Sequence, residues 1–91
     1  MKKISRRDKL KIYGDLLSAL NSETKTEKIV LTRVQLQINV PFDRLKKYVS
    51  EIAELGLIQN ENELQLTIKG KQYLREYERV LEFMKRMGLS Y

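Results

Sequence analysis

Hydrophobic residues in the first part of the chain recur at the i, i+3, i+4 spacing of one helical face: Leu10, Tyr13, Leu16, Leu17 and Leu20. Ser5, with Asp8 three residues later, is a weak capping signal for the start of this helix, and Asn21 indicates its end. The polar residues 22–28 then predict a loop, and the β-prone residues 29–31 predict a short strand.

Residues 32–58 have the pattern of two helices joined by a tight turn. Thr32 is expected to cap the first of them, and Asn39 is suited to end it in a left-handed conformation. Pro41 suits the first turn of the second helix, and Gly56 is expected to end that helix. The apolar positions expected to face the core are Val34, Leu36 and Ile38 in the first helix, and Phe42, Leu45, Val49, Ile52 and Ala53 in the second. Two helices with so short a connection predict a helix-turn-helix.

The last third of the chain predicts a hairpin followed by one long helix. Two short strands, 57–59 and 63–67, flank the turn residues 60–62, and Thr67 is the expected cap of a helix that runs to about residue 87. Apolar residues spaced 4, 3, 4, 3 along this helix form a heptad seam, which Leu81 widens: Tyr73, Tyr77, Val80, Met84 and Met87. Such a helix is about 30 Å long, more than a small domain can cover, so the seam predicts a homodimer. The alternative is an amphipathic helix folded back over its own core.

Composition narrows the possible functions. The 91 residues are 42% hydrophobic and 33% charged, which favours one small folded domain. Cysteine and histidine are absent, and no nucleophile–base set or phosphate-binding glycine loop is present, so we expect neither an enzyme nor a metal or cofactor site. No apolar run is long enough to cross a membrane, and the N-terminus lacks the apolar segment of a secretory signal, which predicts a cytoplasmic protein.

A formal net charge of +6 favours a polyanionic partner, and double-stranded DNA is the first candidate. The second helix of the helix-turn-helix carries Arg44, Lys46 and Lys47 in its first two turns, which enter a major groove in proteins of this kind, and Lys47 and Ser50 are expected to read bases or hold phosphates. Arg44 is the best candidate for reading a base, because a guanidinium bridges guanine O6 and N7. The residues expected to hold phosphates are Thr32 and Arg33 at the start of the preceding helix, and Arg6 and Arg7 in the basic N-terminal run. The alternative for the lysines and arginines is a solvated helix face.

The order helix, strand, helix, helix, hairpin, long helix is that of a winged helix. The residues NVPFDRLKKYVSEIAELGLI, followed by LQLTIKGKQYL, resemble the small basic winged-helix proteins of crenarchaea, the Sso ten-a chromatin-type proteins and related archaeal transcription regulators. The resemblance implies a nucleoid-associated homodimer held by an antiparallel coiled coil of the last helices. It departs in its short acidic wing tip, with Glu61 and Glu63, and in a last helix that ends early, near Gly88.

These observations together predict an α+β, mostly α fold: a winged helix-turn-helix over residues 1–67, and a dimerisation helix over residues 68–91 of the same unit. The expected function is that of a DNA-binding transcription regulator or a chromatin-type protein, and the sequence does not separate these two. The competing function is a winged-helix protein–protein interaction module that uses its last helix and does not bind DNA.

Overall fold

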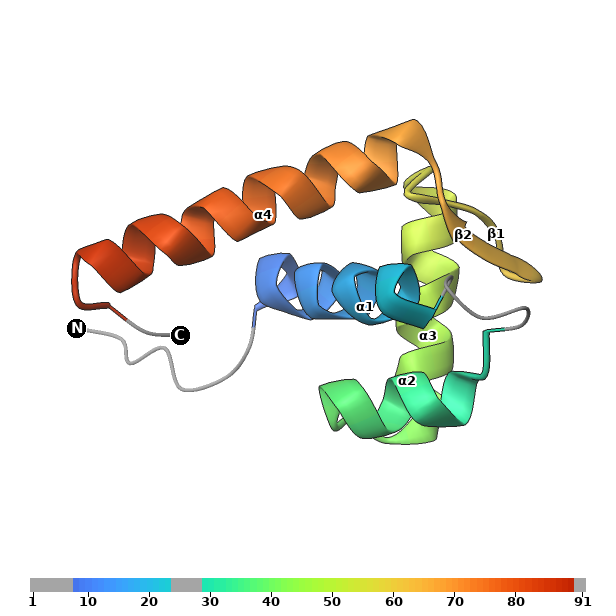
Figure 1. Cartoon of the computed structure of the whole chain (residues 1–91). Helices are drawn as coiled ribbons and strands as arrows, with labels where there is room; N and C mark the ends of the chain where they lie inside the picture. The colour runs from blue at the N-terminus through green and yellow to red at the C-terminus, as the bar shows by residue number, and fades with distance from the viewer. Residues whose placement is uncertain (1–7, 24–28, 90–91) are drawn as a thin grey trace.

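The computed structural model describes residues 8–23 and 29–89, and these residues form a mostly helical α+β fold (Figure 1). Its elements follow in the order α1 (Lys9–Glu23), α2 (Leu31–Ile38), α3 (Phe42–Glu54), β1 (Ile58–Asn60), β2 (Glu63–Leu66) and α4 (Ile68–Arg86). The two strands pair antiparallel as a small hairpin, with Ile58 opposite Leu66. The predicted fold class is therefore confirmed.

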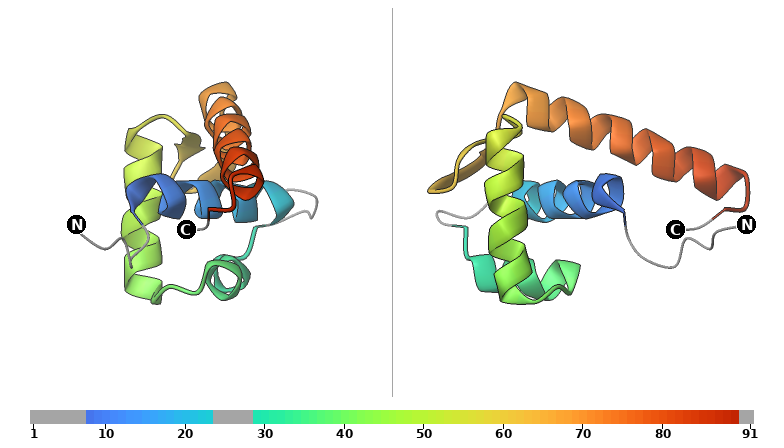
Figure 2. Two further views of the ribbon diagram at one scale, coloured as in Figure 1. Left: turned by 90° about the vertical axis from the view of Figure 1, so that its left-hand side faces the viewer. Right: turned by 180° about the vertical axis from the view of Figure 1, so that it is seen from behind.

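Helix α1 is the centre of the molecule. It lies between α4 on one side and α2 on the other (Figure 2), and the side chains of Lys9 and Tyr13 in its N-terminal half contact Glu51 of α3. One continuous core joins all these elements, and its buried members are Leu16, Leu17, Ala19, Leu20, Val34, Ile38, Leu45, Val49, Ile52, Leu57, Ile58, Leu66, Leu74 and Tyr77. Since each of the four helices and both strands contribute to this core, the position of α3 is fixed from several directions.

The turns and caps that the sequence predicts are largely present. Asn39 ends α2 with a left-handed φ of 54°, and Gly56 follows α3 with a φ of 80°. Thr67 caps α4, because its hydroxyl oxygen accepts a hydrogen bond of 3.0 Å from the backbone N–H of Gly70. Helix α1 is capped by Asp8, whose carboxylate accepts from the N–H of Lys11, whereas Ser5 lies outside the described residues.

Some of the predictions are wrong around α2 and at the start of α3. Residues 29 and 30 are irregular and Leu31 already begins α2, so the predicted strand is absent from this described stretch. Val30 occupies the N-cap position of α2, without a side-chain capping bond, so Thr32 is not the cap. Leu36 is 82% exposed, and Phe42 is 39% exposed and lies outside the core. Leu36 is two residues from both Val34 and Ile38, which places it about 200° around the helix from these buried positions.

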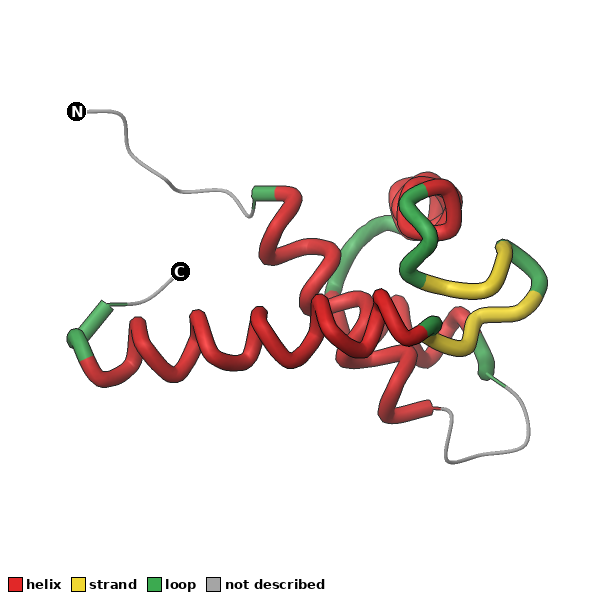
Figure 3. Tube along the Cα trace, turned by 90° about the horizontal axis from the view of Figure 1, so that it is seen from above, coloured by secondary structure: helices red, strands yellow, loops and turns green. Residues whose placement is uncertain are grey.

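Helix α4 crosses α1 at a close contact between a glycine and an aromatic ring. A Cβ atom on Gly14 would lie 2.4 Å from the ring of Tyr77, so only glycine permits this approach. The Tyr77 hydroxyl donates a hydrogen bond of 3.0 Å to Asp15, and the Tyr73 hydroxyl donates one of 2.9 Å to the carbonyl of Leu10. These contacts involve the N-terminal half of α4, and its C-terminal half extends beyond the other helices (Figure 3).

Candidate nucleic-acid interface

The outward face of α3 presents three cations to solvent. Arg44, Lys46 and Lys47 are all exposed, and within residues 8–23 and 29–89 none of them forms an ion pair. The Lys46 ammonium lies 6.0 Å from the centre of the Phe42 ring, one helical turn earlier. These cations are the residues that the sequence assigned to a duplex, and the chain's own described side chains leave them accessible to phosphates and bases.

The acidic residues of α3 are arranged differently from its cations. Asp43, in the first turn, and Glu54, at the end, are exposed, and Ser50 between them is half-buried. Glu51 is directed towards α1, where its carboxylate accepts hydrogen bonds from the Lys9 ammonium at 2.7 Å and from the Tyr13 hydroxyl at 2.5 Å. Part of the negative charge of α3 is therefore compensated within the protein.

Aromatic rings complete the contact of α1 with α3. The Lys9 ammonium lies 5.6 Å from the centre of the Tyr13 ring and 5.5 Å from that of Tyr48, and the two rings meet edge to face with their centres 6.5 Å apart. The contact joins a hydrogen-bonded ion pair to cation–π interactions, and it holds α3 at a fixed angle to α1. Sequence reasoning missed this role of Lys9, whose partner lies 42 residues away.

The electrostatics of this contact agree with its geometry. The hydrogen bond from Lys9 lowers the pKa of the Glu51 carboxyl below its ordinary value, and the bond from Tyr13 acts in the same direction. The hydrogen bond to Glu51 in turn raises the pKa of Lys9. Burial, followed by the hydrogen bond to Glu51, raises the pKa of the Tyr13 hydroxyl. At neutral pH all three groups are thus held in the protonation states that make these bonds.

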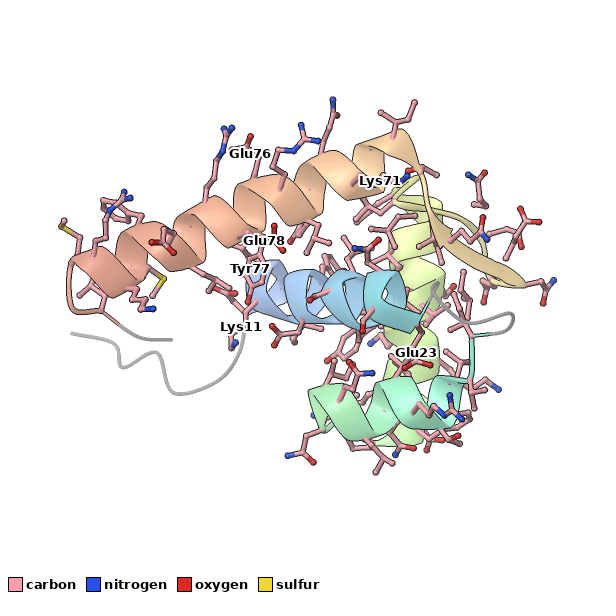
Figure 4. All side chains as sticks on the ribbon, in the orientation of Figure 1. Lys11, Glu23, Lys71, Glu76, Tyr77 and Glu78 are labelled. Carbon is pink, nitrogen blue, oxygen red and sulfur yellow. The ribbon has the colours of Figure 1, made fainter. Side chains whose placement is uncertain are left out.

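The start of α2 presents Thr32 and Arg33, both exposed, as the sequence predicts for phosphate contacts. The Arg33 guanidinium lies 3.8 Å from a carboxylate oxygen of Glu23, at the end of α1. The amide of Gln37 donates a hydrogen bond of 3.1 Å to the other oxygen of Glu23, a side chain labelled in Figure 4. A phosphate group at this position would have to share Arg33 with that carboxylate, a contact between two helices that one sequence does not reveal.

The hairpin contributes no cation to this surface. Its sequence from Ile58 to Leu66 contains no lysine or arginine, and its tip carries the exposed carboxylates of Glu61 and Glu63. The side-chain oxygen of Asn60 accepts hydrogen bonds from the backbone N–H groups of Asn62 and Glu63, which shapes the tight turn. Phosphate groups are repelled by such a tip, so a basic surface must come from the helices or from the N-terminal run. Arg6 and Arg7 of that run lie outside the described residues.

The residues assigned to a dimer seam divide into two groups along α4. Tyr77 is buried, and Tyr73 is half-buried, against α1 of the same chain, so this half of the seam belongs largely to the fold. Val80 and Met84 are half-buried, whereas Leu81 and Met87 are exposed. A groove of about 350 Å³ runs between the start of α1 and α4, with Leu10, Tyr73 and Val80 among its lining residues.

A compact unit of three helices, in which α2 and α3 form a helix-turn-helix and a two-stranded hairpin follows, defines the winged-helix class of proteins. The sequence pattern of the winged helix-turn-helix family matches residues 6–85. The chain therefore belongs to this family. Neither a curated protein nor a solved structure matches the chain significantly. Among the described residues, no helix has the length and apolar character that crossing a bilayer requires.

Proposed function

We propose that this protein is a DNA-binding regulator or chromatin-type protein that places the first two turns of α3 in the major groove. The observation that carries the proposal is the row of exposed cations on α3, Arg44, Lys46 and Lys47, none of which forms an ion pair with a described carboxylate. In a winged helix this segment is the one that contacts base edges. Arg44 is assigned to a guanine, since its guanidinium can donate two parallel hydrogen bonds.

The remaining contacts of the proposed complex are with the DNA backbone. Lys47 and Ser50 lie further along the same helix, where they reach bases or phosphates, and Thr32 and Arg33 are placed to hold a phosphate at the start of α2. Arg6 and Arg7 in the basic N-terminal run extend the phosphate contacts. Since the wing tip is acidic, we assign no DNA contact to it.

A salt titration tests this proposal. Fluorescence anisotropy with a labelled duplex gives the slope of log K against log salt, which is about −0.9 per phosphate neutralised. The double variant Arg44→Ala/Lys47→Ala is expected to weaken binding and to reduce the slope by up to about 1.8. The matched control is Arg75→Ala/Lys85→Ala, which removes the same charges from exposed positions on α4 and should leave binding nearly unchanged.

Two results would contradict the proposal. Equal losses in the two double variants would mean that net charge, and not the α3 surface, drives binding. Complete absence of salt-dependent binding would favour the protein–protein interaction module, which the exposed apolar end of α4 supports. If DNA binds, Arg44→Ala should reduce the preference among several duplex sequences more than it reduces non-specific binding, and equal loss on every sequence would refute base reading by Arg44.

We also propose that a second copy of the chain binds along α4, as the resemblance to the Sso ten-a archaeal proteins implies. Val80 and Met84 are half-buried, Leu81 and Met87 are exposed, and this part of α4 extends beyond the other helices. Covering such an apolar surface is favourable in water. Val80→Lys should give monomers in sedimentation, whereas Glu82→Lys, about 200° further around the helix, should leave the dimer intact. A Val80→Lys variant that still sediments as a dimer would contradict this assignment.

A further inference from the structure

Phe42 is an apolar residue that does not belong to the hydrophobic core. It is the first residue of α3 and is 39% exposed, while Leu45, Val49 and Ile52 of the same helix are buried. It also lies outside the set of partly buried residues that pack against the core. A ring that is 39% exposed is covered over most of its surface, and only the exposed part gains nothing for the fold. Stability of the free protein therefore does not account for that exposed part.

The described neighbour of Phe42 on α3 is a cation of the proposed DNA surface. The ammonium of Lys46 lies 6.0 Å from the centre of the Phe42 ring, while Arg44, about 200° around the helix from Phe42, is exposed in the same first turns. This cation–π contact across one helical turn restricts the ring while the ammonium remains open to solvent. Phe42 and Lys46 thus present an apolar group and a charge together at the N-terminal end of α3.

A major groove offers such an apolar side chain one matching group. Its base edges are hydrogen-bond donors and acceptors, except for the methyl group on C5 of thymine. We propose that Phe42 is a specificity-determining residue that packs against the 5-methyl group of thymine when α3 enters the groove. This inference rests on the proposed DNA binding and adds a sequence preference at a residue other than Arg44. The same methyl group occurs on 5-methylcytosine, which is the second source of this chemistry.

The experiment compares duplexes of one sequence that contain either thymine or uracil, which differ only by that methyl group. The wild-type protein should bind the thymine duplex about fourfold more tightly for each methyl group that it buries. Phe42→Ala should bind both duplexes equally. The matched control is Leu55→Ala, which removes an exposed apolar side chain beyond the other end of α3 and should retain the preference. Circular dichroism should show a folded Phe42→Ala variant, because Phe42 lies outside the core.

Each other outcome is decisive. Equal binding of the two duplexes by the wild-type protein, or a thymine preference that persists in Phe42→Ala, would overturn the assignment of Phe42 while the proposed DNA binding stands. A second pair of duplexes, with cytosine or 5-methylcytosine, separates the two sources, and a gain confined to methylcytosine would overturn the assignment to thymine. If neither thymine nor uracil duplex binds at low salt, the proposed function itself fails, and this inference fails with it.

Discussion

The contact of Gly14 with Tyr77 gives the sharpest prediction for the fold. In the variant Gly14→Ala the new Cβ would lie 2.4–2.5 Å from three ring carbons, so the ring must move by about 1 Å to reach an ordinary contact. Overpacking of this kind costs about 1–3 kcal/mol, and moving the ring also weakens the hydrogen bond from Tyr77 to Asp15, worth about 1 kcal/mol. Alanine in place of glycine returns about 1 kcal/mol of helix propensity.

The net expectation for Gly14→Ala is a loss of about 1–3 kcal/mol in the free energy of unfolding. In a domain of this size, each kcal/mol lowers the melting temperature by about 4–8 °C. Urea denaturation followed by circular dichroism measures the change. Ser18→Ala is the matched control, because Ser18 is exposed on the same helix and should gain a few tenths of a kcal/mol at most, about the difference in propensity. A Gly14→Ala variant that is more stable than the wild type would refute the placement of α4 on α1.

Three further predictions concern a cap, an ion pair and a competing carboxylate. Thr67→Ala should cost about 1 kcal/mol in urea denaturation, while Thr32→Ala, at a position that caps no helix, should be nearly neutral. Because the folded pKa of Glu51 lies below its unfolded value of about 4.5, its contribution to stability is present above that pH and is lost as the pH falls through the folded pKa. Glu51→Gln should flatten this acid limb of a stability–pH curve, and an unchanged limb would show that the Lys9–Glu51 contact contributes nothing. Glu23→Gln should strengthen DNA binding by about two- to fivefold in a low-salt titration, because it releases the Arg33 guanidinium on α2. Unchanged affinity would mean that Arg33 does not belong to the DNA interface.

The elements of this fold follow from local signals that the sequence carries plainly. Asn39 and Gly56 end helices with positive φ, and Thr67 begins one with a side-chain cap, so these boundaries are visible in the residues themselves. The hairpin follows from Asn60 and Asn62 between two apolar stretches. Each signal depends on neighbours within a few residues, which is why the order of the elements could be predicted.

The predictions failed where a stretch of sequence fits both a strand and a helix, or where contacts between elements determine which side chains are buried. The alternation of Val34, Leu36 and Ile38 is compatible with a strand, and in a helix only two of the three can face the core. Phe42 lies close to the apolar stripe of α3 in sequence, yet the end of a helix can project past the core.

In the candidate DNA-binding surface, too, the exposed residues could be predicted and the contacts between helices could not. The exposed cations of α3 follow from helical periodicity, since Lys47 lies opposite the buried residues of its own helix and Arg44 lies beside them. The contacts of Glu51 with Lys9 and of Arg33 with Glu23 join residues on different helices, and one sequence contains no signal for such pairs.

The central claim is that the cationic face of α3 contacts duplex DNA, and an NMR titration of the isotopically labelled protein tests it most directly. On addition of a short duplex at low salt, the largest changes in amide chemical shift should fall on residues 42–47 and 50, with small changes around Arg75 on the exposed face of α4. The largest changes on α4, with α3 unaffected, would contradict the account.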